Sequence, residues 1–88
     1  MSFFDGAVVR EQGVTFGVAV VRPGTLAGSE RRDAALSGFQ AAFGGIPTVL
    51  MEQNVRGVPT YFGRPDIVRF LTSIDPRRLP WRRFSLST

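Results

Sequence analysis

Two valine-rich runs lie in the first quarter of the chain, and their side chains alternate between two faces as in a β-strand. They cover residues 7–11 and 14–21, and Gln12-Gly13 separates them. Because glycine at the second position of a tight turn supplies the positive φ that such a turn requires, the pattern predicts two antiparallel strands joined by a hairpin. One face of the second strand carries side chains small enough to let a helix approach closely. These are Thr15, Gly17, Ala19 and Val21.

After this hairpin, apolar residues recur at the spacing of an α-helix. Ser29 is the expected N-cap, because its side chain can accept a hydrogen bond from the first helical turn. Glu30 stands in that turn, where the helix dipole favours an acid. Gly44-Gly45 supplies a left-handed stop. The predicted apolar positions of this helix are Ala35, Leu36, Phe39, Ala42 and Phe43.

Two further strands are predicted in the middle of the chain. The short apolar run 46–52 is typical of a buried strand. Residues 54–57 have the composition of a turn, and the run 58–62 returns as the next strand.

A second helix and a last strand complete the pattern. Pro65 and Asp66 begin the helix, because proline and an acid are both favoured in a first turn. Asp75-Pro76 ends this helix. In residues 81–86, apolar and polar side chains alternate well enough to predict an edge strand. The apolar face of this helix consists of Ile67, Phe70, Leu71 and Ile74.

The elements follow the order β-β-α-β-β-α-β in a single domain over residues 1–88. This order predicts an α/β fold, with α+β as the alternative: a mixed sheet of about five strands and two helices. The crossover from strand 14–21 through the first helix should place strand 46–52 parallel to it. We expect both helices to pack on the sheet, so that four of their side chains are largely buried. These are Phe39, Phe43, Phe70 and Leu71.

Three missing residue types restrict the chemistry. The chain has no cysteine, no histidine and no lysine, and all eleven basic residues are arginine. Disulfides, thiolate nucleophiles, an imidazole general base and a lysine Schiff base are therefore excluded. The seven acids are scattered without paired spacing, and the glycines form no phosphate loop. We expect no enzyme, and no metal, nucleotide or redox cofactor.

Two segments resemble parts of known families without carrying their chemistry. Residues 55–60 (VRGVPT) are similar to the segment around the cis-proline of thioredoxins, but the redox reaction of that family needs cysteines. Residues 18–24, 46–51 and 61–65, with the two helices, look like the back half of response-regulator receivers. Arginine stands where that family has an acid and a lysine, at or near Arg22 and at Arg64, so the resemblance implies no phosphorylation.

The strongest local bias is a cluster of arginines around the single tryptophan, Trp81. Basic residues with an aromatic can bind phosphate and stack a base, and the same residue types are enriched in protein-binding hot spots. A third interpretation is an edge strand kept unpaired by charge. The candidate partner-binding residues are Tyr61, Arg64, Arg77, Arg78, Trp81, Arg82 and Arg83.

These observations favour a small regulatory or adaptor domain that works through protein–protein contacts in the bacterial cytoplasm. Its partner would be another protein, with a signalling protein as one candidate. A homodimer through the valine-rich N-terminal strands is a further expectation. The alternative is an arginine-mediated nucleic-acid or polyanion binder, which a net charge of +4 supports only weakly. The longest apolar stretch, 14–21, is too short for a membrane span, and the N-terminus lacks the pattern of a signal peptide.

Overall fold

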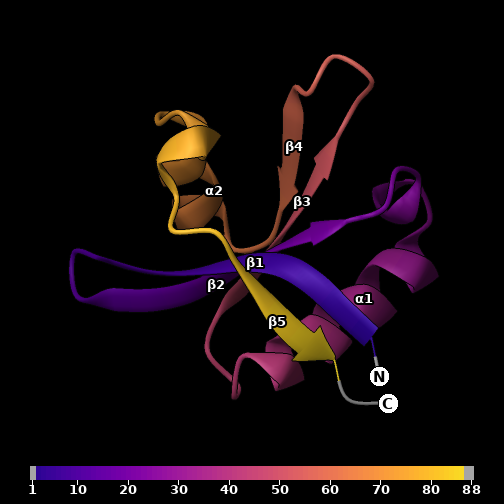
Figure 1. The fold of residues 1–88 in the computed structure, drawn as a ribbon, viewed down its shortest axis with the longest axis horizontal. Helices are drawn as coiled ribbons and strands as arrows, with labels where there is room; N and C mark the ends of the chain where they lie inside the picture. Colours follow the sequence, from indigo (N-terminus) through magenta and orange to yellow (C-terminus); the bar gives the residue numbers. More distant parts are fainter. Residues whose placement is uncertain (1, 87–88) are drawn as a thin grey trace.

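The computed structural model describes residues 2–86 and contains the predicted elements in the predicted order (Figure 1). Five strands and two α-helices are joined by turns, two of which contain a short 3-10 helix. The elements are β1 (Ser2–Glu11), β2 (Val14–Val21), η1 (Thr25–Ala27), α1 (Ser29–Ala42), β3 (Thr48–Gln53), β4 (Pro59–Phe62), α2 (Pro65–Thr72), η2 (Pro76–Arg78) and β5 (Arg82–Leu86).

The five strands form one mixed sheet in the order β4-β3-β2-β1-β5. β2 and β3 run parallel, as predicted for a crossover through α1, and the other neighbouring pairs are antiparallel. β5 lies at one edge, which confirms the edge strand predicted for the tail, and β4 lies at the other.

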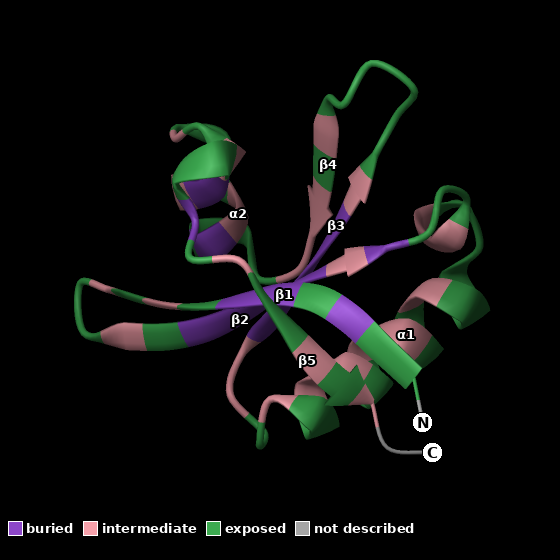
Figure 2. Cartoon of the chain, viewed as in Figure 1, coloured by how far each residue is buried: buried purple, intermediate pink, exposed green. Residues whose placement is uncertain are grey.

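The two helices cover opposite faces of this sheet. Leu36, Phe39 and Phe43 bring α1 against a core formed with Phe4 and Leu50. A second core on the other face contains Phe16, Val18 and Val49 and is covered by Ile67 and Leu71 of α2. Figure 2 shows the buried residues concentrated where the strands cross, with exposed residues at the hairpin ends. Leu71 is completely buried, and Phe39, Phe43 and Phe70 are half-buried and packed on the cores.

A cluster of phenylalanine rings fixes α1 on the sheet. Phe4 packs edge-on against Phe39 and Phe43, with ring centroids 4.8 and 5.5 Å away, and stacks on Phe84 of β5. Phe43, directly after α1, lies over Gly17, where a Cβ atom would come within 2.5 Å of its ring. The close approach predicted for the small side chains of β2 is therefore confirmed.

β1 is longer than the valine pattern predicted, because it begins at Ser2 rather than at Ala7. Gly6 interrupts the pattern, yet the packing around it leaves little room for a side chain, since a Cβ atom there would lie 3.0 Å from Phe4 and from Phe43. β2 is an interior strand, and β1 lies between β2 and β5. The valine-rich strands thus do not supply the sheet edge on which the expected homodimer was based, and self-association itself stays a prediction.

The helix termini differ from the prediction by a few residues. Gly28, and not Ser29, is the N-cap of α1, because the first helical hydrogen bond runs from Arg32 N to Gly28 O at 2.8 Å. Ser29 makes no capping hydrogen bond with its side chain. α2 begins at Pro65 as predicted but ends at Thr72, before Asp75, whose side chain instead caps η2.

The turn between β3 and β4 is closed by Asn54. Its Oδ1 accepts hydrogen bonds from the backbone N–H of Arg56 at 2.9 Å and of Val58 at 3.0 Å. Residues 2–86 contain no cis peptide bond. The backbone at Pro59 therefore differs from the thioredoxin segment that residues 55–60 resemble.

Candidate functional site

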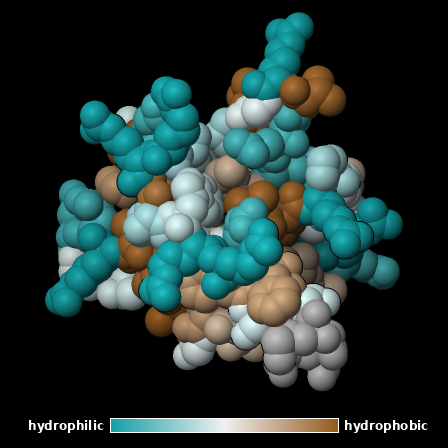
Figure 3. Space-filling view, in the orientation of Figure 1, coloured by the Kyte–Doolittle hydropathy of each residue, from teal (hydrophilic) through white to brown (hydrophobic). Residues whose placement is uncertain are grey.

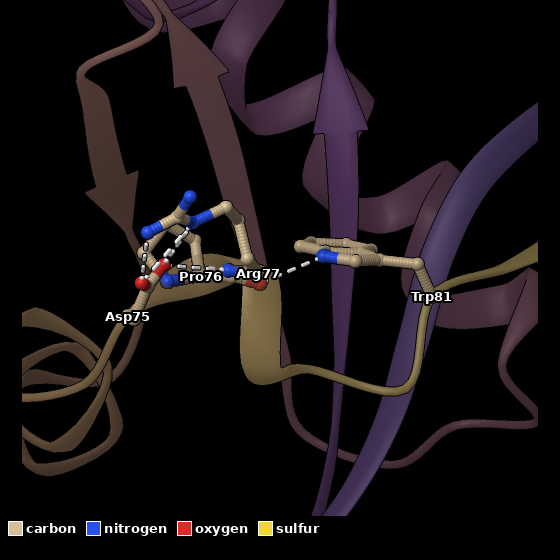
Figure 4. Close-up of polar contacts among 4 residues, drawn as sticks. All are labelled: Asp75, Pro76, Arg77 and Trp81. Carbon is tan, nitrogen blue, oxygen red and sulfur yellow. Dashed lines mark hydrogen bonds and ion pairs between the residues drawn. The ribbon is translucent and has the colours of Figure 1, made fainter.

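Trp81 lies between η2 and β5 and is held in place by a hydrogen bond. Its indole Nε1–H donates to the backbone carbonyl of Pro76 at 2.8 Å (Figure 4). The ring is half-buried against the core on the α2 face of the sheet. An indole satisfied in this way presents a large aromatic surface in one fixed orientation, so that little entropy remains to be lost on binding.

The ring of Trp81 forms one wall of an open hollow of about 510 Å³, which we call the Trp81 hollow. Its apolar part combines strands β2 and β3 with η2, and polar side chains stand at its rim. The lining residues are Asp5, Val20, Met51, Gln53, Pro76, Arg77 and Trp81. Four segments that are distant in the sequence thus meet at one concave surface.

A second hollow, of about 320 Å³, adjoins the first through Pro76, which lines both. We call it the Tyr61 hollow. It lies between β4 and the C-terminal end of α2 and is lined by Val58, Pro59, Tyr61, Leu71, Thr72, Ile74 and Pro76. Burial raises the pKa of Tyr61, and its buried hydroxyl has no hydrogen-bond partner among the described residues.

Arg77, at the rim of the Trp81 hollow, is bound to a carboxylate of its own chain. Its guanidinium donates to both oxygens of Asp75, at 2.8 to 3.2 Å, and its backbone N–H donates to Asp75 Oδ1 at 2.9 Å. These contacts lower the pKa of Asp75 to about 2. Figure 4 shows this pair together with Pro76, and Trp81 to the right of all three.

Arg64, at the other end of α2, is likewise bound to a carboxylate of its own chain. It is the N-cap residue of this helix, and its guanidinium forms a bidentate ion pair with Asp66 at 2.7 and 2.8 Å. This pair lowers the pKa of Asp66. Because the Tyr61 hollow adjoins the C-terminal end of α2, the structure does not bring Arg64 and Tyr61 into one site.

The arginines of β5 point to opposite faces of the sheet. Arg83 pairs with Asp5 across the β1–β5 ladder, with its Nε 3.9 Å from the carboxylate, on the face of the Trp81 hollow. Arg82 stands opposite Gly6 and shares the α1 face with Phe84. The predicted cluster is therefore divided, and only Arg77 and Trp81 of the seven candidates line the same hollow.

The remaining arginines, which form no ion pair with a described residue, belong to seven segments of the fold, and two of them, Arg22 and Arg31, line a common hollow. Arg78 of η2 is exposed and forms no ion pair with a described residue. The same holds for arginines that belong to six other segments of the fold. These are Arg10, Arg22, Arg31, Arg56, Arg69 and Arg82.

The β3–β4 hairpin projects from the body of the domain (Figure 1) and carries apolar side chains near its end. Val55 is fully exposed and Val58 is 55% exposed, with Arg56 between them. Figure 3 shows apolar and hydrophilic side chains next to one another at this projection. Since Val58 also lines the Tyr61 hollow, the apolar surface continues from this hollow toward the hairpin.

Sequence reasoning missed most of the residues that line the Trp81 hollow. Val20 and Met51 belong to strands whose apolar patterns indicated only a core. Asp5 and Gln53 belong to no recognisable sequence motif, and Pro76 indicated only a helix end. No local signal marks them, because their common feature is a position around Trp81 that the sheet order creates.

No metal site or membrane-spanning segment is found in the described part of the chain. Residues 2–86 contain no group of three acidic, histidine or cysteine side chains arranged to hold a metal ion. The helices of this range are too short and too polar to cross a membrane.

Comparison with known proteins yields no relative. No protein-family model, no curated protein and no solved structure matches the chain.

Proposed function

We propose that this chain is a small non-enzymatic regulatory or adaptor domain that binds a segment of another protein in the Trp81 hollow. The observation that carries the proposal is the fixed indole of Trp81 beside the apolar side chains of Val20 and Met51. Tryptophan, tyrosine and arginine dominate the binding energy of protein interfaces, above all where they border a pocket that excludes water.

The shape of the surface supports a peptide segment as the ligand. The Trp81 and Tyr61 hollows lie side by side with Pro76 between them, so one short segment could place two apolar side chains into them. Both hollows are open, which suits a ligand that continues beyond them as part of a larger protein. We place this function in the bacterial cytoplasm, as the sequence led us to expect.

The alternative function, binding of nucleic acid or another polyanion, has weaker support. Arg64 and Arg77 each donate to a carboxylate of their own chain, and Arg83 lies near Asp5. The unpaired arginines are spread over seven segments, whereas a polyanion needs a continuous positive track to release several counterions together.

A selection experiment tests the proposal. A library of random dodecapeptides displayed on phage is selected on the immobilised domain, and the enriched peptides are synthesised and titrated by calorimetry at about 0.15 M salt, the physiological ionic strength. We expect Trp81→Ala to weaken binding by about 2 kcal/mol or more, with only mild salt dependence. Arg10→Ala, on a strand but outside both hollows, is the matched control and should leave binding unchanged.

Fluorescence provides an independent readout, because Trp81 is the single tryptophan of the chain. Burial of its ring by a peptide should shift its emission to shorter wavelength. A library that yields no Trp81-dependent peptide would overturn the proposal. Sub-micromolar binding of DNA or RNA at the same salt, abolished by replacing Arg82 and Arg83 together, would establish the polyanion alternative.

A further inference from the structure

The central strands of the sheet separate at one end. The β1–β2 ladder stops at the pair Gly6–Ala19, although both strands continue beyond it. Residues 2–5 of β1 pair only with β5, and residues 20–21 of β2 pair only with β3. Figure 1 shows β1 turning away from β2 in this region. We call the resulting gap the seam.

Two strand edges face one another across the seam without a ladder partner among the described residues. In a strand, alternate residues direct their backbone N–H and C=O groups to the two sides. β1 uses one side for β5, and β2 uses one side for β3. The other side of each is directed into the seam, where a further strand could accept and donate hydrogen bonds.

A hollow opens on each face of the sheet at the seam. One is the Trp81 hollow on the α2 face. The other, of about 520 Å³, reaches α1 and is called the Phe39 hollow. Asp5 and Val20, the first residues beyond the last β1–β2 pair, line both hollows. The Phe39 hollow is further lined by Ser2, Phe3, Phe4, Val21, Arg22, Thr25, Arg31, Ala35, Phe39 and Leu86.

This arrangement matches the geometry of an extended chain. Successive side chains of a strand point to opposite faces of a sheet. A strand in the seam would therefore send alternate side chains into the Trp81 hollow and the intervening ones into the Phe39 hollow. A helical ligand gathers its apolar side chains on one stripe and could occupy only one of the two hollows.

The charges at the two hollows differ, and they define the chemistry of each face. Arg22 and Arg31 border the Phe39 hollow, and neither forms an ion pair with a described residue. On the other face, Arg77 is the arginine that lines the Trp81 hollow and it is bound to Asp75, so the residues lining this hollow offer no unpaired positive charge. A ligand side chain on the α1 face should therefore be acidic, and one on the α2 face should be apolar.

We propose that the seam binds an extended segment of the partner protein, in which apolar residues alternate with acidic ones, as an added strand between β1 and β2. The inference rests on the proposed function, since the Trp81 hollow is half of the site. It adds the conformation of the ligand and its chemical pattern.

The peptide selection described above tests the pattern. We expect the enriched peptides to carry apolar residues at every second position with Asp or Glu between them. Enrichment of peptides with helical spacing or proline-rich repeats that depend on Trp81 would overturn the strand model while leaving the proposed function intact. Failure to enrich any Trp81-dependent peptide would instead overturn the proposed function, and the strand model with it.

Two matched measurements test the binding mode with the peptide that binds most tightly. Arg31→Gln removes the positive charge but keeps a polar side chain and should weaken binding at least tenfold, whereas Arg10→Gln should change it less than twofold. Replacing the acidic residues of the peptide by their amides should remove this difference. Equal affinity for the two protein variants would contradict the acidic half of the pattern.

Backbone pairing has its own readout. Methylation of two alternate amide nitrogens in the peptide should reduce affinity at least tenfold for each of the two possible sets, because a strand between β1 and β2 directs one set of donors to β1 and the other set to β2. Hydrogen exchange of the complex should show new protection at residues 3–5 and 20–21. Unchanged exchange in both segments, together with binding that depends on Trp81, would mean that the ligand lies over the hollow and not in the seam.

Discussion

The ring of Phe43 lies on the backbone of Gly17, where a Cβ atom would come within 2.5 Å of Phe43 Cδ2. Gly17 sits in the middle of β2, a position at which glycine costs strand stability unless another group uses the space. The missing side chain allows the end of α1 to touch the sheet. One aromatic ring and one glycine thus determine how closely the helix packs on the α1 face.

Gly17→Ala should therefore destabilise the domain. The added methyl group collides with the ring of Phe43, and overpacking of this kind costs about 1–3 kcal/mol. Gly38→Ala is the matched control, because no atom lies within 4 Å of the Cβ position there and alanine favours the helix by about 1 kcal/mol. Urea unfolding of both variants gives the free energies of unfolding.

The collision can be separated from a general effect of alanine in the strand. Combining Gly17→Ala with Phe43→Ala should cost less than the sum of the two single changes, because the ring that obstructs the methyl group is gone. Strictly additive costs would show that Phe43 does not press on Gly17 in solution.

Trp81→Phe should lower the free energy of unfolding by about 1 kcal/mol. The change keeps an aromatic ring but removes the hydrogen bond to Pro76 O. Phe3→Leu serves as the comparison, since Phe3 is 59% exposed and the change should stay within about 0.5 kcal/mol. Chemical denaturation, followed by circular dichroism because the first variant lacks tryptophan, measures both. Equal stability of Trp81→Phe and the wild type would mean that Trp81 is not anchored to η2.

The pKa of Asp75 should lie well below the ordinary aspartate value of 3.8. Donation from the guanidinium and the backbone N–H of Arg77 lowers its pKa from 3.8 to about 2. A carboxyl whose pKa is lower in the folded state stabilises the fold fully above its unfolded pKa, and this contribution is lost as the pH falls through the folded pKa. Stability should thus decrease between about pH 4 and pH 2. An NMR titration of the side-chain carboxyl carbon gives the midpoint directly.

Arg77→Gln provides the control for this titration. It should return the pKa of Asp75 toward 3.8 and make the loss of stability between about pH 4 and pH 2 less steep. An unchanged midpoint in this variant would mean that Arg77 does not hold the carboxylate in solution.

Tyr61→Phe should stabilise the free domain by about 1 kcal/mol. Its hydroxyl is buried without a hydrogen-bond partner among the described residues, and an unsatisfied buried group of this kind costs about 1–3 kcal/mol. If a ligand in the Tyr61 hollow supplies the missing hydrogen bond, the same variant should bind the selected peptides more weakly. Thermal melts and calorimetry measure the two effects, and a destabilised variant would show that the hydroxyl is satisfied in solution.

Leu71→Ala should be among the most damaging single changes, with a cost of about 2–5 kcal/mol. Leu71 is completely buried between α2 and the sheet, so truncation leaves a cavity. Val55→Ala, at the fully exposed end of the β3–β4 hairpin, should change stability by less than about 0.5 kcal/mol. Similar costs for the two changes would contradict the packing of α2.

Local patterns were sufficient to identify the elements. The turn at Gln12-Gly13 and the start of α2 at Pro65 depend on backbone preferences of a few neighbouring residues, and both occur where they were predicted. The boundaries were less predictable. Gly6 looked like the end of the valine-rich strand pattern, and only the phenylalanine rings packed around it explain why β1 continues through it.

The candidate site was predictable only in part. The sequence singled out Trp81 and Arg77, which do line one hollow, because tryptophan among arginines is a local feature. It also suggested one cluster of arginines along the tail. Strand alternation instead sends Arg82 and Arg83 to opposite faces, and Asp75 occupies Arg77.

The sequence alone determined the order of the elements, the absence of cysteine, histidine and lysine chemistry, and the mixed character of the sheet. All of these follow from composition and from interactions between residues near one another in the chain. Only the tertiary structure decided the strand order, the separation of β1 from β2 after Gly6 and the meeting of Asp5, Val20 and Trp81. The reason is physical: long-range strand pairing and packing depend on which surfaces fit together, and no short window of sequence contains both partners.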